Sequence, residues 1–102
     1  MLNIGRREAY TWLAHLLCEF LARLKAVGLT RDNRFELPIT QAELADAIGT
    51  STVHVNRVLQ VLRADGLIQT KGTQITVPDW ARLQEAGEFD PLHLHLKEDE
   101  AA

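Results

Sequence analysis

The sequence has only one cysteine, Cys18, which excludes an intramolecular disulfide and any zinc or iron–sulfur site built from several cysteines. A chain without disulfides fits a reducing compartment, so we expect a cytoplasmic protein. No apolar run reaches the length that crosses a membrane, and the first residues lack the basic, apolar and small-residue order of a signal peptide. Internal repeats and a glycine-rich phosphate loop are also missing. The 102 residues suffice for one domain that folds without covalent staples.

The sequence also lacks an excess of basic residues. It has 11 Lys and Arg and 14 Asp and Glu, which gives a net charge of −3. The acidity is concentrated late in the chain. Residues 1–80 carry nine basic and eight acidic residues, whereas residues 81–102 carry two and six. Phosphate neutralisation dominates the affinity of nucleic-acid-binding proteins, so a chain with this charge would bind nucleic acid modestly and rely on dimerisation for useful affinity.

The residues show no pattern for catalysis or metal binding. Nothing pairs a nucleophile with a base and an orienting acid, so we expect no enzymatic activity and no cofactor. His15 and Cys18 are three residues apart, but no further cysteine or acidic residue stands at a useful spacing, which favours a packed thiol beside an edge imidazole. His93 and His95 share one face of an extended stretch without a third ligand, which favours solvent-facing imidazoles.

The stretch from Thr40 to Arg63 predicts two short amphipathic helices joined by a tight turn. Thr40 and Glu43 have the spacing of a capping box, in which each side chain satisfies a backbone N–H at the start of a helix. Gly49 stands where a left-handed residue is needed to reverse the chain, and Ser51 is placed to cap the second helix. Apolar residues at three- and four-residue spacing form the inward faces of the pair: Leu44, Ala45, Ile48, Val55, Val58, Leu59 and Leu62.

The second helix of this pair has a further side that is largely polar. At 100° per residue, the positions opposite its apolar side are Val53, Asn56, Arg57 and Gln60. A major-groove reader requires polar residues on this outward face, so the pair predicts a DNA-binding helix-turn-helix. An ordinary αα-hairpin with a solvated outer face is the alternative. The combined spacing of small Ala45, the turn at Gly49 and the two inward valines favours the DNA-binding motif.

The residues before this motif predict one long helix and one short strand. A helix over residues 3–27 carries an apolar stripe and ends at Gly28. The stripe consists of Ile4, Ala9, Leu13, Leu16, Leu17, Phe20, Leu21, Leu24 and Val27. Residues 34–37 then alternate polar and apolar side chains, as a half-buried strand does.

The residues after the motif predict a hairpin and a short helix. Residues 67–70 and 74–77 form the two strands, joined by a turn at Lys71–Gly72, and this hairpin makes the motif a winged helix. Thr70, Lys71, Gly72 and Thr73 form the tip of the wing. Pro78 is suited to the first position of the next helix, which carries Trp80 and Leu83 on its inward side and ends at Gly87.

We therefore predict a fold that is mainly α with a small antiparallel β-sheet, a winged helix-turn-helix preceded by a long N-terminal helix. The chain divides into that helix (1–30), the winged helix with a C-terminal extension (31–96) and an acidic tail (97–102) that we expect to be disordered. The extension includes FDPLHLHL, whose alternating pattern indicates an extended segment laid against the domain.

Four stretches carry a resemblance to a known family: RFELPITQAELADAIGTS, TVHVNRVLQVLRADGLI, KGTQITV and FDPLHLHL. They are similar to the C-terminal DNA-binding domain of the Crp/Fnr family of bacterial transcription regulators, and the resemblance covers about residues 5–96. Members of that family also carry an N-terminal sensor domain and a long dimerisation helix. We therefore expect this chain to be the DNA-binding part of a longer regulator, whose effector the chain does not determine.

The resemblance implies that the early exposed positions of the second helix read bases in the major groove. Well-studied members carry Arg or Glu at one or both of the positions of Thr52 and Val53, so their base preferences do not transfer. Arg57 matches the arginine of the family and suits guanine, whose O6 and N7 accept two hydrogen bonds from a guanidinium. The base-reading candidates are Thr52, Val53, Asn56 and Arg57. The phosphate-contacting candidates are Thr40, Ser51, His54, Gln60 and Lys71.

Three of these candidates have open alternatives. Val53 either contacts a thymine methyl or packs beside the groove, and Asn56 either pairs with adenine or stands at the flank of the interface. Lys71 either reaches a phosphate or is a solvated turn lysine.

These expectations add up to sequence-specific binding of double-stranded DNA. The resemblance implies a homodimer of the parent protein on a palindromic site, with half-sites about one helical turn apart and RNA polymerase as a further candidate partner. The alternative function is a winged-helix protein-interaction module without DNA binding, which the pI of about 5.7 and the uncharged Thr52–Val53 pair favour.

Overall fold

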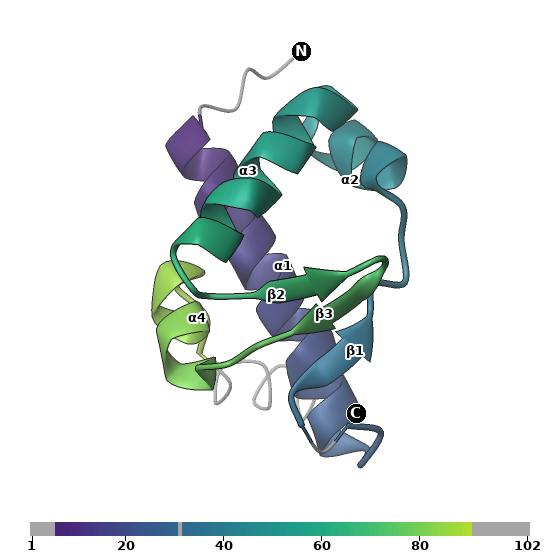
Figure 1. Cartoon of the computed structure of the whole chain (residues 1–102), viewed down its shortest axis with the longest axis vertical. Helices are drawn as coiled ribbons and strands as arrows, with labels where there is room; N and C mark the ends of the chain where they lie inside the picture. Colours follow the sequence, from purple (N-terminus) through teal and green to yellow (C-terminus); the bar gives the residue numbers. More distant parts are fainter. Residues whose placement is uncertain (1–5, 31, 91–102) are drawn as a thin grey trace, which may run out of the picture.

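The computed structural model describes residues 6–30 and 32–90, which form four helices and a three-stranded antiparallel sheet (Figure 1). The predicted fold class is confirmed. In chain order the elements are α1 (Arg6–Ala26), β1 (Arg34–Glu36), α2 (Gln41–Ile48), α3 (Thr52–Ala64), β2 (Gln69–Lys71), β3 (Gln74–Thr76) and α4 (Trp80–Ala86). None of the helices in these ranges is long and apolar enough to cross a membrane.

Several predictions concern residues outside the described ranges. They are the start of the long helix at residue 3, Ile4 in its stripe, the end of the extended segment with His93 and His95, and the acidic tail.

Helix α1 runs past α3 and α4 and supplies one wall of the core (Figure 1). The predicted stripe is largely confirmed, because Leu13, Leu17 and Leu21 are fully buried and several flanking members pack against the core. The small side chains of Ala14 and Cys18 are also fully buried beside them. Val27 was wrongly included in the stripe. It lies beyond the last residue of the helix and is 68 % exposed.

Helices α2 and α3 begin and end where the sequence predicts. The Thr40 side chain accepts a hydrogen bond from the Glu43 backbone N–H, and the Glu43 carboxylate accepts one from the Thr40 N–H, both at 3.0 Å. Gly49 has a φ of 69°, the left-handed conformation that reverses the chain, and Ser51 Oγ accepts from the His54 N–H at 3.1 Å. All seven residues predicted to face inward from this pair are buried.

The sheet has the order β1-β3-β2, so the strand before the helix pair joins the wing through its last strand (Figure 1). The predicted hairpin turn at Lys71–Gly72 is wrong by one residue. Lys71 pairs with Gln74, which leaves Gly72 and Thr73 as the turn. Gly72 has a φ of 63°, and a two-residue hairpin of type II′ places its glycine at the first central position. The predicted register would have required that conformation of Lys71.

Helix α4 begins at Trp80, two residues later than predicted, because Asp79 rather than Pro78 determines its start. The Asp79 carboxylate accepts a hydrogen bond from the Arg82 N–H at 3.2 Å, so Asp79 is the N-cap and Pro78 lies before the helix. Leu83 is fully buried and Trp80 is partly buried, as predicted. At the other end, a Cβ on Gly87 would lie 2.5 Å from the backbone nitrogen of His15, so only glycine allows this close approach to α1.

Candidate nucleic-acid interface

The outward side of α3 is the surface that the sequence predicts to read DNA. Val55, Val58 and Leu62 are buried beneath the helix, whereas all four base-reading candidates, Thr52, Val53, Asn56 and Arg57, are exposed. Gln60 is exposed as well, one turn further along the same side as Arg57 and Val53. The predicted division of α3 into a buried and an open side is thus confirmed, while the roles of the open residues stay predictions.

A groove lies between α3, the start of α2 and the wing. Its polar walls bring together Thr40, Asn56 and Gln60 from the prediction, with Thr70 of β2 and Thr73 of the wing turn. Its apolar lining comes from Leu37, Ile39, Leu59 and Ile75. The structure therefore assembles one concave surface from three segments that are far apart in the sequence.

Two residues of this groove, Gln41 and Arg63, were not among the sequence candidates. Arg63 is seven residues after Asn56, which is two helical turns, so the two side chains lie on the same side of α3. That spacing could have placed Arg63 beside Asn56 from the sequence. The sequence of α3 does not show, however, that the wing lies opposite this side and makes it a wall of the groove. Gln41 is the first residue of α2, where a backbone N–H has no partner within the helix.

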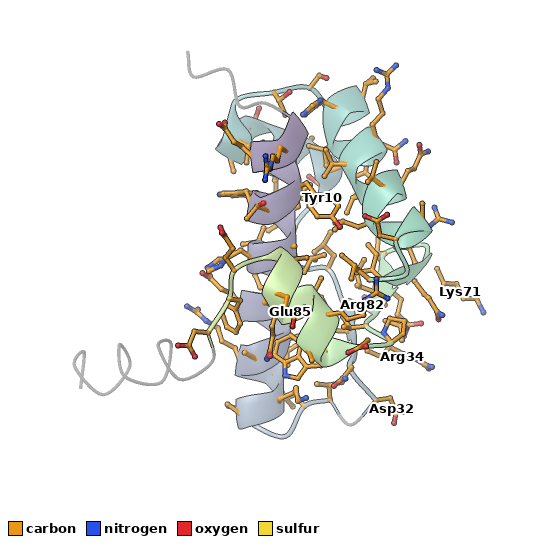
Figure 2. The ribbon with its side chains drawn as sticks, turned by 90° about the vertical axis from the view of Figure 1, so that its left-hand side faces the viewer. Tyr10, Asp32, Arg34, Lys71, Arg82 and Glu85 are labelled. Carbon is orange, nitrogen blue, oxygen red and sulfur yellow. The ribbon has the colours of Figure 1, made fainter. Side chains whose placement is uncertain are left out.

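The charged side chains that α3 and the wing contribute to this surface are positive. Residues 52–64 include Arg57 and Arg63 but no Asp or Glu. Lys71 at the end of β2 is exposed and extends away from the body of the domain (Figure 2). Within residues 6–30 and 32–90 none of these three cations is paired with a carboxylate. They are thus available to neutralise phosphates.

Thr40 and Ser51, the two hydroxyl-bearing candidates, already cap helices, which restricts the hydrogen bonds they can make to a phosphate. The Oγ atoms of Thr40 and Ser51 each accept a backbone N–H, so their O–H groups, rather than their lone pairs, are open to a phosphate oxygen. The Thr40 N–H is occupied by the Glu43 carboxylate at 3.0 Å. A phosphate contact of Thr40 would therefore use the hydroxyl.

His54 is the candidate whose placement fits its predicted role least well. The residue is partly buried at the edge of α3, beside Val58 and Val61, and its Nε2 atom is buried without a hydrogen-bond partner. The ring would have to turn for that atom to reach a phosphate. A phosphate contact of His54 thus requires either the other ring nitrogen, Nδ1, or a rotation of the side chain.

Contacts at its C-terminal end hold α3 to the two neighbouring helices. Tyr10 of α1 donates a hydrogen bond to the Asp65 carboxylate at 2.7 Å, and the Arg82 guanidinium of α4 donates one to the Asp65 carbonyl at 3.0 Å. Figure 2 shows Tyr10 and Arg82 on the two elements beside the end of α3. Burial, and secondarily the bond to Asp65, raises the pKa of Tyr10 to about 12. These two residues, which join the end of α3 to α1 and α4, were not among the predicted ones.

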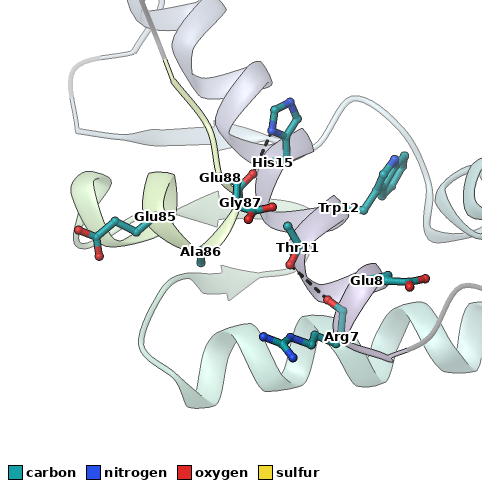
Figure 3. Close-up of a pocket in the computed structure, with 9 residues that line it drawn as sticks. All are labelled: Arg7, Glu8, Thr11, Trp12, His15, Glu85, Ala86, Gly87 and Glu88. Carbon is teal, nitrogen blue, oxygen red and sulfur yellow. Dashed lines mark hydrogen bonds between the residues drawn. The ribbon is translucent and has the colours of Figure 1, made fainter. Parts of the chain in front are cut away.

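Outside the α3 surface, a second groove lies between α1 and the end of α4 (Figure 3). Its charged lining consists of three carboxylates, those of Glu8, Glu85 and Glu88, and the guanidinium of Arg7, beside Trp12 and His15. Because the carboxylates outnumber the cation, this lining disfavours a phosphate backbone. This groove is therefore no part of the candidate interface.

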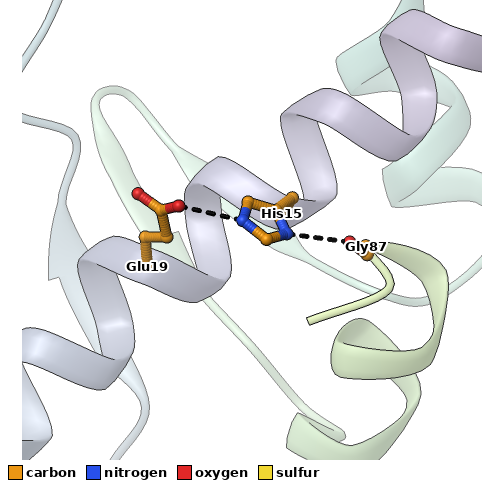
Figure 4. Close-up of polar contacts among 3 residues, drawn as sticks. All are labelled: His15, Glu19 and Gly87. Atoms are coloured by element: carbon orange, nitrogen blue, oxygen red, sulfur yellow. Dashed lines mark hydrogen bonds and ion pairs between the residues drawn. The ribbon is translucent and has the colours of Figure 1, made fainter. Parts of the chain in front are cut away.

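His15 in this second groove joins α1 to the end of α4 (Figure 4). Its Nδ1 lies 3.0 Å from the Gly87 carbonyl oxygen, and its Nε2 lies 2.9 Å from the Glu19 carboxylate. Both partners are acceptors, so both bonds form together only when each ring nitrogen carries a proton. Glu19 stands four residues after His15 on α1, and this i,i+4 contact was not among the predictions.

The thiol of Cys18 is packed in the core, as predicted. Cys18 is fully buried, and burial, with a smaller contribution from Glu19, raises the pKa of its thiol to about 12. In the described part of the chain, no group of three His, Cys, Asp or Glu side chains is arranged to hold a metal ion.

Comparison with known proteins agrees with this geometry. The family model described as the Crp-like helix-turn-helix domain matches residues 13–86, from α1 to the end of α4. The chain belongs to the Crp-like helix-turn-helix domain family. The resemblance inferred from the four sequence stretches is thereby confirmed.

Relatives of this Crp-like domain are transcription regulators. The chain is 38 % identical over 93 residues to the transcriptional activator protein FnrL of Cereibacter sphaeroides, covering 86 % of this chain and 38 % of FnrL. It is 34 % identical over 85 residues to a probable transcriptional activator of Rhizobium leguminosarum bv. viciae, covering 82 % of this chain and 35 % of the relative. The chain thus spans little more than a third of the length of these relatives.

Solved structures show the same arrangement of elements. The Thermus thermophilus catabolite activator protein is 26 % identical, with a TM-score of 0.51 over 78 % of this chain and 35 % of that protein. FixK2 of Bradyrhizobium japonicum has a TM-score of 0.54 over 72 % of this chain and 37 % of that protein, and its 23 % identity supports the fold alone. The family and its relatives favour a transcription regulator over the protein-interaction module.

Proposed function

We propose that this Crp-like domain binds double-stranded DNA sequence-specifically as part of a bacterial transcription regulator, with α3 in the major groove. The observation that carries the proposal is the open side of α3, which presents Arg57 without any acidic residue on the helix and is flanked by the capped start of α2 and by the wing. A major groove about 12 Å wide admits such a helix, and the elements beside it are placed to meet the two phosphate backbones.

The roles of individual residues follow from their places on this surface. Thr52, Val53, Asn56 and Arg57 are proposed to face base edges, since they lie in the first two turns of α3. Thr40, Ser51, His54, Gln60 and Lys71 are proposed to contact phosphates. Arg63 joins this second group because it lies in the groove beside the wing.

The parent protein is proposed to act as a homodimer on a palindromic site, with half-sites about one helical turn apart. In this arrangement α1 is the continuation of a dimerisation helix, and RNA polymerase is a further partner of the complete regulator. We place the protein in the cytoplasm and infer that it binds rather than catalyses.

The experiment that tests the proposal measures binding of the whole chain to mixed genomic duplex fragments at several salt concentrations. We expect the logarithm of the binding constant to fall linearly with the logarithm of salt concentration, by about 0.9 for each phosphate neutralised. A random duplex pool, selected through several rounds of binding, should then yield an enriched sequence. Binding without salt dependence, or no binding, would instead support the protein-interaction module.

A further inference from the structure

Val53 is an exposed apolar side chain in the first turn of α3, with 60 % of its surface accessible. Single exposed apolar residues are ordinary on protein surfaces, so exposure alone indicates nothing. Its position is more informative. Val53 is four residues before Arg57, which places both on the open side of the helix, and its side chain is not packed into the domain.

We propose that Val53 reads the methyl group of a thymine in the major groove, beside the base that Arg57 contacts. This inference rests on the DNA-binding function proposed above and specifies its target. The valine side chain has no hydrogen-bond donor or acceptor, so apolar contact is the only contact it can make with a base edge. Among the four bases, only thymine presents an apolar group there, its C5 methyl.

The spacing of the two residues limits where the thymine lies. Side chains four residues apart on a helix are separated by about 5–6 Å, whereas successive base pairs are about 3.4 Å apart. Val53 and Arg57 therefore address base pairs that are adjacent or one step further apart. The preferred half-site contains a thymine within two base pairs of the position that Arg57 reads.

The same chemistry makes the contact sensitive to DNA methylation. A 5-methylcytosine carries its methyl group at the same place in the major groove as thymine does. A site with cytosine at the Val53 position should consequently bind more tightly when that cytosine is methylated.

The test uses the whole chain and the duplex obtained by selection. Each thymine is replaced in turn by deoxyuridine, which removes only the methyl group, and the dissociation constant is measured by fluorescence anisotropy at fixed salt. Loss of one buried methyl contact predicts about four-fold weaker binding at one thymine of the half-site. In a duplex with cytosine at that position, 5-methylation should strengthen binding by a similar factor.

Two variants assign the effect to the side chain. Val53→Ser should remove the difference between thymine and deoxyuridine. Val27→Ser is the matched control, since Val27 is similarly exposed at 68 % but follows α1, and it should keep the difference.

If no thymine is sensitive to deoxyuridine, or if Val53→Ser keeps the sensitivity, the methyl contact is refuted while selected, salt-dependent binding still supports the proposed function. If the chain selects no sequence, the proposed function fails and the methyl contact fails with it.

Discussion

Replacing Arg57 by Ala is the sharpest single test of the proposed reading surface. The side chain is exposed on the open side of α3 and has no carboxylate partner among the described residues, so its removal leaves no buried group unsatisfied. Alanine favours helix at least as strongly as arginine does. We therefore expect the free energy of unfolding to change by less than about 0.5 kcal/mol, so that any effect on DNA is an effect on the interface.

The expected loss follows from the bidentate contact. A guanidinium that donates to guanine O6 and N7 contributes roughly 1–3 kcal/mol of discrimination, which corresponds to about 5- to 150-fold weaker binding of the selected duplex. The loss should be concentrated at one base pair. In the variant, the four possible pairs at that position should bind almost equally, while preferences elsewhere in the half-site persist.

The assay compares the selected duplex with the three substitutions at each position, by anisotropy at one salt concentration. Arg57→Lys keeps the charge without the planar pair of donors and should lose most of the preference for guanine. Arg63→Ala is the matched control, because it removes the same side chain from the part of α3 beside the wing and should weaken all duplexes alike. If Arg57→Ala weakens binding to every sequence equally, Arg57 contacts a phosphate rather than a base, and the assigned reading face is wrong.

Four further changes test other parts of the structure. Lys71→Ala should weaken all sequences alike and lower the salt slope by about one, and an unaltered slope would remove the wing from the interface. Thr40→Ala should cost about 1 kcal/mol in a denaturant titration, because α2 loses its cap, and a cost near zero would argue against the capping box. Gly87→Ala should lower the free energy of unfolding by at least roughly 1–3 kcal/mol, because its Cβ would meet the backbone of α1 at 2.5 Å, and a neutral change would contradict this packing. Stability should decline as pH rises from about 9 to about 12, because burial raises the pKa of the Cys18 thiol and the unfolded chain ionises first, and Tyr10 adds to the decline above about pH 10. Cys18→Ala should therefore flatten the decline most clearly between about pH 9 and 10, and an unchanged profile there would show that the thiol is solvated.

The parts of the fold that sequence alone predicts correctly depend on contacts between near neighbours. The capping box of Thr40 and Glu43 and the cap at Ser51 involve residues three apart, so their spacing is visible in the sequence. Two of the boundary errors arose where two local signals compete. Asp79 caps α4, so the helix does not start at Pro78. In the wing, Gly72 rather than Lys71 occupies the first position of the turn.

The parts that sequence reasoning missed depend on residues that are far apart in the chain. Tyr10 meets Asp65 across 55 positions, and His15 meets the Gly87 carbonyl across 72. Hydrophobic periodicity reports which side of a helix is buried, but it does not report which polar side chain of another element arrives beside it. Arg63 belongs to the candidate interface for the same reason, since the wing supplies the other wall of its groove.

The distribution of charge explains how a chain with a net charge of −3 can still bind DNA. Glu8, Glu85 and Glu88 line the groove between α1 and α4, whereas Arg57, Arg63 and Lys71 belong to α3 and the wing. The acidic groove repels the phosphate backbone, so it opposes binding in any orientation that turns this groove toward DNA. Because few cations lie on the favourable side, we expect low non-specific affinity and discrimination that depends on contacts to base edges. We therefore expect the ratio of specific to non-specific affinity to be set mainly by the first two turns of α3, where Val53 and Arg57 lie.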